Sequence, residues 1–263
     1  MTARDSMKCL ACSLALVTAF ALASPKALAT GGGIRLLNAE VDLGDRAALQ
    51  RGAKLFVNYC LSCHSASFMR YQRMGRDLGL SDEQVKKNLL FAGKKLGDQM
   101  TVAMRADDAK KWFGKAPPDL SVIARARGEN WLYTYLMTFY EDPNRPVGTN
   151  NLVFDGVGMP DVLSELRGSQ VLRAHAAPEG QEAEGKEPPG PRSVNETLQL
   201  ERAGLMSPAE FRRAMKDLTG FLVYLGEPAK LERYRVGGWV LLFLVIFYWL
   251  CRGLYKEYWK DVH

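Results

Sequence analysis

Apolar residues recur at intervals of three and four along much of the chain, which is the spacing of helices that bury one face. This pattern predicts helices over residues 45–59, 107–113, 120–126 and 131–140. Ser81, with Gln84 three residues later, has the capping-box signature of a further helix start. Ser207, followed by Pro208 and Glu210, marks the start of another helix. Little of the chain alternates as strands do, so the expected fold is mainly α with long loops.

The first 29 residues have the pattern of a cleaved signal peptide. Arg4 and Lys8 precede an apolar core over residues 10–23, and cleavage is expected after Ala29. A retained membrane anchor is the alternative, although the apolar core is too short to span a bilayer comfortably. A signal peptide predicts that the chain is exported, with residues 30–229 as one domain outside the cytoplasm.

A second apolar segment, residues 236–255, predicts a transmembrane helix at the C-terminal end. Residues 236–251 are apolar or glycine without interruption, and as a helix they cover roughly 24 Å of a hydrocarbon core about 30 Å thick. Extension to Tyr255 closes this gap and leaves Arg252 near the boundary. A buried core helix is the alternative. Because the signal peptide exports the preceding domain, residues 256–263 are expected to remain in the cytoplasm.

Between these two ends the composition is that of an ordinary soluble domain, with one exception. Residues 176–195 are rich in Pro, Gly and Glu and hold few large apolar side chains, which predicts a flexible insertion. The 263-residue chain has a formal net charge of +6, which is spread along the sequence without a run of Lys or Arg. This distribution gives little support to binding of nucleic acid.

Cys60, Cys63 and His64 form a Cys-x-x-Cys-His motif, which attaches a c-type haem. Two thiols three positions apart on a helical turn reach the two vinyl groups of one porphyrin, and the adjacent histidine then supplies a nitrogen ligand to the iron. The other three of the five cysteines lie in the predicted signal peptide and anchor, so no disulfide framework is expected. A redox-active cysteine pair is the alternative, but such a pair needs no following histidine and usually belongs to a βαβ unit.

Several side chains could supply the second axial ligand of this haem. Methionine is the usual partner of histidine in high-potential electron carriers. Met159 lies in a glycine-rich loop over residues 155–160, where the backbone can approach a porphyrin closely. The competing methionines are Met69, Met74, Met100 and Met104. His175 beside the insertion and His263 at the last position are poorly placed.

A haem with histidine and methionine ligands has no open coordination site, which favours electron transfer over oxygen or peroxide chemistry. Its propionates are anionic, and Arg125 and Arg127 are candidates to bind them. Solvated arginines on a helix are the alternative. A haem-based sensor of small ligands is another class of function, and it would need a labile axial position.

The order of these segments resembles the cytochrome c1 family, the haem subunits of cytochrome bc1 complexes. The matching segments are 60–65, 117–121 with 123–127, 158–160 and the C-terminal anchor. The proline–aspartate–leucine stretch that leads into two arginines is the specific part, because all c-type cytochromes share the haem motif. Residues 94–115 and the insertion match poorly. Trp131 stands where relatives carry a tyrosine near the haem, which leaves open whether it contacts the haem.

The resemblance implies roles for individual residues. His64 matches the family's fifth iron ligand, and Met159 matches its sixth. Arg127 matches an arginine that contacts the haem edge and a propionate. Pro117 and Pro118 match prolines that line the haem, where a carbonyl accepts the second N–H of the axial histidine.

The implied activity is electron relay within a complex and not catalysis by this chain alone. A Rieske iron–sulfur protein would deliver an electron to one covalent haem c, and a soluble or tethered cytochrome c would remove it. The implied partners are cytochrome b, the Rieske protein and membrane lipid, in a dimeric complex of a bacterial inner membrane, with the haem domain in the periplasm. Another membrane-anchored c-type cytochrome, such as an oxidase subunit or tethered carrier, is the alternative.

Overall fold

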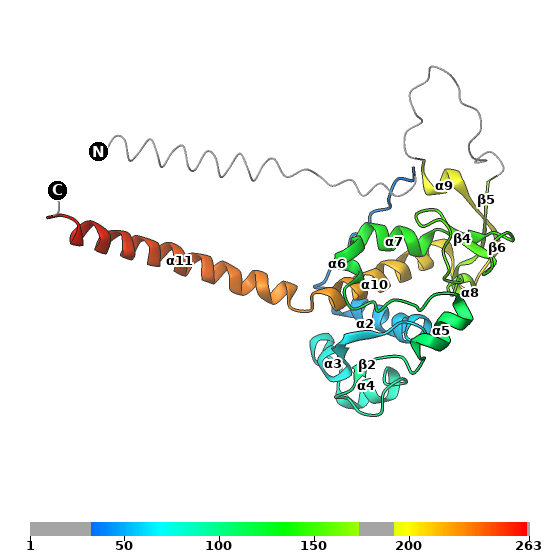
Figure 1. Cartoon of the computed structure of the whole chain (residues 1–263), viewed down its shortest axis with the longest axis horizontal. Coiled ribbons are helices and arrows are strands. Elements are labelled where there is room, and N and C mark those ends of the chain that lie inside the picture. The colour runs from blue at the N-terminus through cyan, green and yellow to red at the C-terminus, as the bar shows by residue number, and fades with distance from the viewer. Residues whose placement is uncertain (1–32, 174–191, 262–263) are drawn as a thin grey trace, which may run out of the picture. The chain divides into compact units, whose positions relative to one another are not determined.

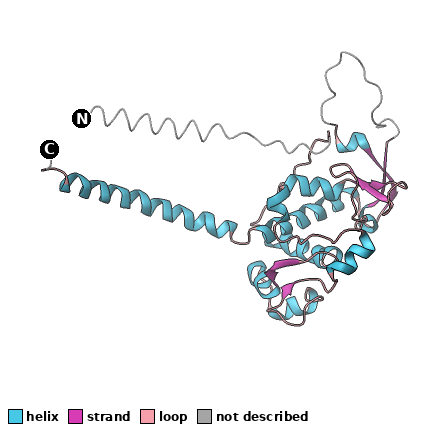
Figure 2. Cartoon of the chain, viewed as in Figure 1, coloured by secondary structure: helices cyan, strands magenta, loops and turns pink. Residues whose placement is uncertain are grey.

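The computed structural model describes residues 33–173 and 192–261, so the predicted signal peptide and residues 176–191 of the predicted insertion lie outside the described ranges. The described part is mainly helical, as the sequence predicted (Figures 1 and 2). Its helices are α2 (Arg46–Leu55), α3 (Tyr71–Leu78), α4 (Asp82–Asn88), α5 (Ala106–Phe113), α6 (Ile123–Arg127), α7 (Glu129–Met137), α8 (Ser164–Arg167), α9 (Val194–Thr197), α10 (Pro208–Gly226) and α11 (Lys230–Tyr258). A π-helical turn, η1 (Phe56–Cys60), follows α2 directly.

The structure also contains short antiparallel strand pairs, which the sequence pattern did not reveal. The pairs are β1 (Ala66–Arg70) with β2 (Gln99–Met100), β3 (Phe139–Glu141) with β4 (Thr149–Asn151), and β5 (Gly168–Leu172) with β6 (Leu198–Ala203). Strands of two to six residues are too short to show a clear alternation of apolar and polar positions.

Two predicted helix boundaries are wrong. The helix expected over residues 120–126 begins only at Ile123, because residues 121 and 122 form a turn in which Val122 has a non-helical backbone with a φ of −125°. The amide of Leu120, just before this turn, donates to the carbonyl of Ser65, 2.8 Å away. The helix expected over 131–140 ends at Met137, because residues 139–141 pair with β4. By contrast, the capping box predicted at Ser81 is present, and Ser207 caps α10 as predicted, through a capping box with Glu210.

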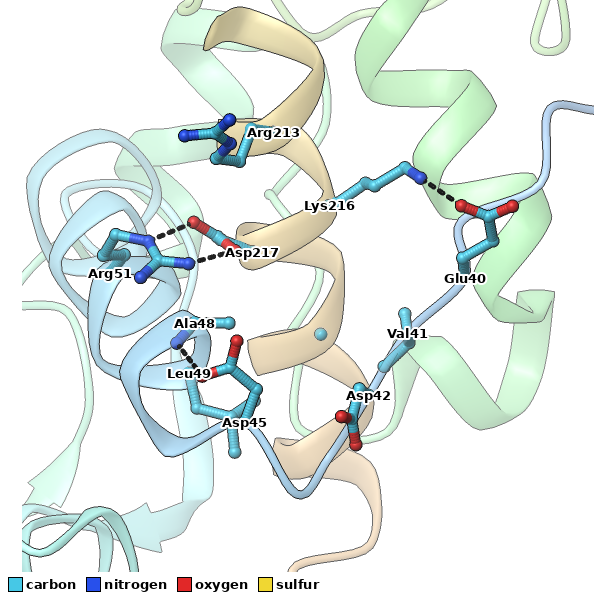
Figure 3. Close-up of a pocket in the computed structure, with 11 residues that line it drawn as sticks. Glu40, Val41, Asp42, Asp45, Ala48, Leu49, Arg51, Arg213, Lys216 and Asp217 are labelled. Carbon is cyan, nitrogen blue, oxygen red and sulfur yellow. Dashed lines mark hydrogen bonds and ion pairs between the residues drawn. The ribbon is translucent and has the colours of Figure 1, made fainter.

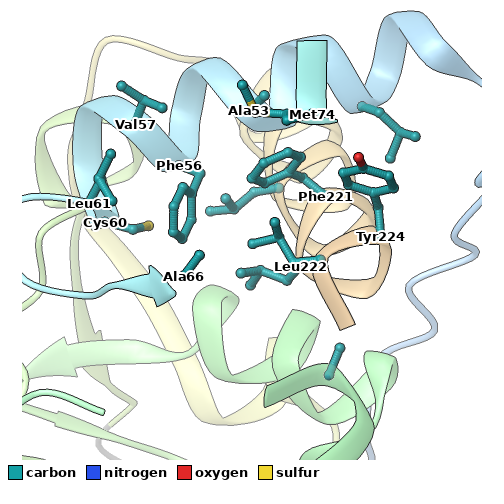
Figure 4. Close-up of a cluster of buried hydrophobic side chains, with 14 of the residues drawn as sticks. Ala53, Phe56, Val57, Cys60, Leu61, Ala66, Met74, Phe221, Leu222 and Tyr224 are labelled. Atoms are coloured by element: carbon teal, nitrogen blue, oxygen red, sulfur yellow. The ribbon is translucent and has the colours of Figure 1, made fainter. Parts of the chain in front are cut away.

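The core of the domain forms where α10 packs against α2 and α7. The rings of Phe56 and Phe221 meet there with centroids 5.5 Å apart, and Cys60 lies in the same buried cluster (Figure 4). Gly52 makes the close approach of α2 and α10 possible, because a Cβ at this position would lie 2.1 Å from the carbonyl oxygen of Asp217. The haem motif therefore follows a helix that is fixed against the longest helix of the core.

Ion pairs reinforce this contact at its edge. Arg51 on α2 donates to both carboxylate oxygens of Asp217 on α10, at 2.6 and 3.1 Å, and this hydrogen-bonded pairing raises the pKa of Arg51 (Figure 3). Lys216 on α10 pairs with Glu40 in the segment that precedes α2. Three parts of the chain are thus held together on one side of α10.

The predicted insertion ends earlier than Asn195. Arg192 forms an isolated bridge with Ile34, and Ser193 caps α9 through a capping box with Glu196. Val194 is buried in a second, smaller core cluster. Residues 192–195 therefore belong to the folded domain. The end of the insertion was predicted wrongly from composition, because these residues pack against a segment more than 150 positions away in the sequence.

Helix α11 extends beyond the predicted anchor of residues 236–255 at both ends. It is the one helix in the described part of the chain that is long and apolar enough to cross a membrane, and its apolar side chains are exposed. Residues 227–229 alone separate it from α10. An exposed apolar surface of this size needs a nonpolar environment, as a bilayer provides.

Replacing Gly52 by alanine should lower the free energy of unfolding by about 1–3 kcal/mol, because the added methyl group forces α2 and α10 apart. Thermal unfolding of the detergent-solubilised protein, followed by circular dichroism, measures the loss. Gly220→Ala is the matched control on α10, where a Cβ would meet Val41 and Leu49 at 3.6 and 3.7 Å, ordinary contact distances. Equal stability of the two variants would contradict the close-contact interpretation.

Candidate haem site

The Cys-x-x-Cys-His motif forms a compact turn at the end of η1. The amides of Cys63 and His64 both donate to the carbonyl oxygen of Cys60, at 3.0 and 2.8 Å. Cys60 is buried in the core, whereas Cys63 and His64 are half-buried. The chain direction in this turn is fixed by the preceding helix and not by a flexible loop, so the three side chains keep a defined relation to the core.

The environment of Cys60 is unlike that of a redox-active cysteine. Burial, together with the neighbouring Cys63, raises the pKa of the Cys60 thiol to about 12. Reactive cysteines of redox pairs have a lowered pKa, which supplies the thiolate they need. The alternative interpretation as a redox pair is therefore disfavoured.

His64 is held by one ring nitrogen while the other stays available. Its Nδ1 lies 2.8 Å from the carbonyl oxygen of Pro118, so Nδ1 carries the proton and donates, and Nε2 keeps a free lone pair. Burial lowers the pKa of His64 despite the opposing effect of this hydrogen bond. The neutral imidazole that iron coordination requires is thus favoured, and a second hydrogen bond of this kind is usual for metal-binding histidines.

The segment that carries Pro118 is fastened to the residues after His64. The backbone N–H and the hydroxyl of Ser67 both donate to Oδ2 of Asp119, at 3.0 and 2.6 Å, and the amide of Phe68 donates to the hydroxyl of Ser121 at 3.0 Å. Burial raises the pKa of Asp119, but the hydrogen bonds from Ser121 and Ser67 outweigh it, and the pKa is lowered overall. These bonds position the Pro118 carbonyl, whereas Pro117 accepts no hydrogen bond in the described structure.

Met159 lies half-buried at the end of a loop that Asn150 organises. The Asn150 amide nitrogen donates to Oδ1 of Asp155 at 2.7 Å, and its amide oxygen accepts the backbone N–H of Gly156 at 3.0 Å. Gly156 has a φ of +68°, a conformation that residues with a side chain rarely adopt. A buried side chain on β4 therefore sets the course of the loop.

The four competing methionines have different surroundings. Met69, Met74 and Met100 are buried in the main core at 3%, 0% and 0% exposure, where they fill space between helices. Met104 is half-buried. Met100 lies in β2.

The sequence did not single out Tyr135, whose hydroxyl donates to the Met159 sulfur at a distance of 3.4 Å. The ring of Tyr135 stacks on Trp131, with centroids 5.1 Å apart and an angle of 11° between the planes. Spacing was the missed signal: Trp131 and Tyr135 are four residues apart, which places them on one side of α7, and Phe139 follows four residues later in β3.

Arg125 and Arg127 lie in different surroundings, although both were predicted to bind propionates. The guanidinium carbon of Arg127 lies 5.0 Å from the centroid of the Trp131 ring and 5.9 Å from that of Phe154. Arg125 lies beside the end of α10, where a Cβ on Gly226 would be 3.3 Å from its Cγ. The two arginines therefore contact different parts of the chain.

A buried ion pair, which the sequence also did not reveal, fixes the chain after Met159. Asp161 and Arg167 are both almost fully buried and hydrogen-bonded to each other. Burial raises the pKa of Asp161 and lowers that of Arg167, because each charge has lost its water. The pair ties the exit of the loop to the end of α8, and the Arg167 guanidinium also lies 5.8 Å from the centroid of the Phe211 ring.

Together, the turn at Cys60, the singly held imidazole and the organised methionine loop define a domain of the c-type cytochrome class. The model of the cytochrome C1 family matches residues 40–171. A protein named cytochrome c1 from Allochromatium vinosum is 48% identical over 95% of this chain and 99% of its own length. The ammonia monooxygenase gamma subunit of Nitrosomonas europaea is 45% identical over 94% of this chain and 97% of its own length.

The chain therefore belongs to the cytochrome c1 family. It is an electron-transport haem protein associated with a cytochrome bc1 complex, which agrees with the predicted class and with the membrane-spanning length of α11. A solved chain described as a hyperthermophilic respiratory Complex III aligns over the full length of both chains at 16% identity with a TM-score of 0.43, which is too distant to add to the argument.

Replacing Arg167 by leucine should lower the free energy of unfolding by about 3–5 kcal/mol, because Asp161 would stay buried without a partner. Chemical denaturation of the full chain in detergent measures this change. The double variant Arg167→Leu with Asp161→Asn removes both charges and should lose less. A single variant as stable as the double variant would show that the ion pair does not hold the loop.

Proposed function

We propose that the chain carries one haem c, attached through Cys60 and Cys63, with His64 and Met159 as the axial ligands of its iron. The observation that supports this most directly is the contact of His64 Nδ1 with the Pro118 carbonyl, which leaves Nε2 as a nitrogen donor. Met159 supplies a thioether at the end of a fixed loop, outside the apolar core that takes up three of its competitors. When bound, the haem supplies one-electron redox chemistry.

The remaining residues of the site bind and orient. Pro118 fixes the plane of the His64 ring, and Asp119 holds Pro118 in place through Ser67. Arg127 is our first candidate for a propionate, since its guanidinium lies at the exposed edge of an aromatic cluster. Arg125 is the second candidate, and Pro117 is proposed to line the haem.

We further propose the relay that the family resemblance implies. A Rieske iron–sulfur protein delivers electrons to the haem of this chain, and a soluble or tethered cytochrome c accepts them. Residues 1–29 export the chain and are removed, α11 anchors it in the lipid of a bacterial inner membrane, and the haem domain lies in the periplasm with the C-terminus in the cytoplasm. Cytochrome b is the membrane partner, and the complex is a dimer.

The second candidate function is that of another membrane-anchored c-type cytochrome, and one observation supports it. The relative from Nitrosomonas europaea bears the name of a monooxygenase subunit, although it is similar over nearly its whole length. Solubilisation of native membranes and affinity purification of this chain distinguish the two candidates. Recovery of cytochrome b and a Rieske protein is expected, and recovery of monooxygenase subunits without them would overturn the bc1 assignment.

Replacing Met159 by alanine should abolish the methionine-to-iron charge-transfer band of the oxidised haem and open the iron to carbon monoxide, because the sixth position loses its thioether. Absorption spectra of the full-length holoprotein, with and without carbon monoxide, test both effects. Met104→Ala is the matched control, since it removes a methionine of similar exposure. Survival of the band in Met159→Ala would disprove the ligand assignment.

A further inference from the structure

The hydroxyl of Tyr135 points at an atom that rarely receives a hydrogen bond. Its oxygen lies 3.4 Å from Sδ of Met159, and a thioether sulfur is only a weak acceptor. A tyrosine hydroxyl keeps its proton at neutral pH and can therefore act as the donor. No other acceptor of this hydroxyl occurs in the described residues. Tyr135 is half-buried, and a hydroxyl removed from water without any partner is destabilising, so this contact has a physical reason to persist.

Contacts on several sides hold the ring of Tyr135 in this direction. Trp131 stacks on it in nearly parallel planes, and Phe139 meets it edge-on with centroids 4.9 Å apart. The backbone carbonyl of Tyr135 also accepts a hydrogen bond from the side-chain amide of Asn151, at 2.8 Å. The hydroxyl therefore cannot turn away from the sulfur without disturbing an aromatic cluster and the end of α7.

We propose that Tyr135 positions the Met159 sulfur and raises the reduction potential of the haem by donating a hydrogen bond to that sulfur. This inference rests on the proposed ligation by Met159. A thioether has two lone pairs, so one can face the iron while the other accepts the hydroxyl proton. The hydrogen bond draws electron density from the sulfur, which then donates less to the iron. Oxidised iron depends more on that donation, so the reduced state is favoured.

The same geometry gives Trp131 a role without any contact with the haem. Its indole supports the Tyr135 ring on one face, and the Arg127 guanidinium lies 5.0 Å from the indole centroid. Trp131 is then a positioning residue that acts through Tyr135. This accounts for an aromatic side chain at a position where the family resemblance led us to expect a tyrosine.

The test is the variant Tyr135→Phe, which removes the hydroxyl and keeps the ring that stacks on Trp131. The matched control is Tyr133→Phe, two residues away on α7, because the Tyr133 hydroxyl lies among the charges of Lys216, Arg212 and Glu40 instead of at Met159. Both variants are made in the full-length holoprotein. The midpoint potential is measured by redox titration, and the methionine-to-iron charge-transfer band is recorded in the oxidised state.

Tyr135→Phe should keep the charge-transfer band and lower the equilibrium constant for reduction about three- to tenfold, a decrease of about 30–60 mV for a one-electron couple. Tyr133→Phe should leave the potential at the wild-type value. An unchanged potential in Tyr135→Phe, or an equal decrease in Tyr133→Phe, would overturn the proposed role of Tyr135 while leaving Met159 as the ligand. A wild-type protein without the charge-transfer band would instead overturn the ligation itself.

Discussion

The hydrogen bonds between residues 64–68 and 118–121 are the constraint on which the site depends. They join the end of the haem motif to a segment more than 50 positions later, and they do so through backbone groups and short side chains that have little freedom to move. The Leu120 amide belongs to the same set of bonds, since it donates to the carbonyl of Ser65 just ahead of α6. Together these bonds hold the Pro118 carbonyl beside the His64 ring and so fix the plane of the imidazole.

The two candidate axial ligands are held by different kinds of interaction. His64 follows α2, which packs at close range on α10, so the packing of the apolar core fixes the position of His64. Met159 lies in a loop whose course is set by polar contacts, with Asn150 before it and the Asp161–Arg167 pair after it. Polar networks with buried members, here Asn150, Asp161 and Arg167, are sensitive to the loss of any one member, whereas the packing around α2 is spread over many side chains.

Much of the architecture could be predicted from local signals. The capping boxes at Ser81 and Ser207 need only neighbouring residues, and the haem motif lies within five positions. Other features escaped prediction because they depend on contacts that the sequence does not show. Residues 192–195 were predicted to be part of a flexible insertion because their partner, Ile34, lies far away in sequence, and the short strands show no alternation. Asp161 and Arg167 lie close in sequence, but nothing in a single sequence shows that both become buried opposite each other.

The three residues between α10 and α11 limit how far the domain can travel. Fully extended, they span about 10 Å, and the charged first turns of α11, residues 230–235, add about 9 Å as a helix. This connection keeps the domain within about 20 Å of the apolar part of α11. A partner that exchanges electrons with the domain therefore has to approach it at that place.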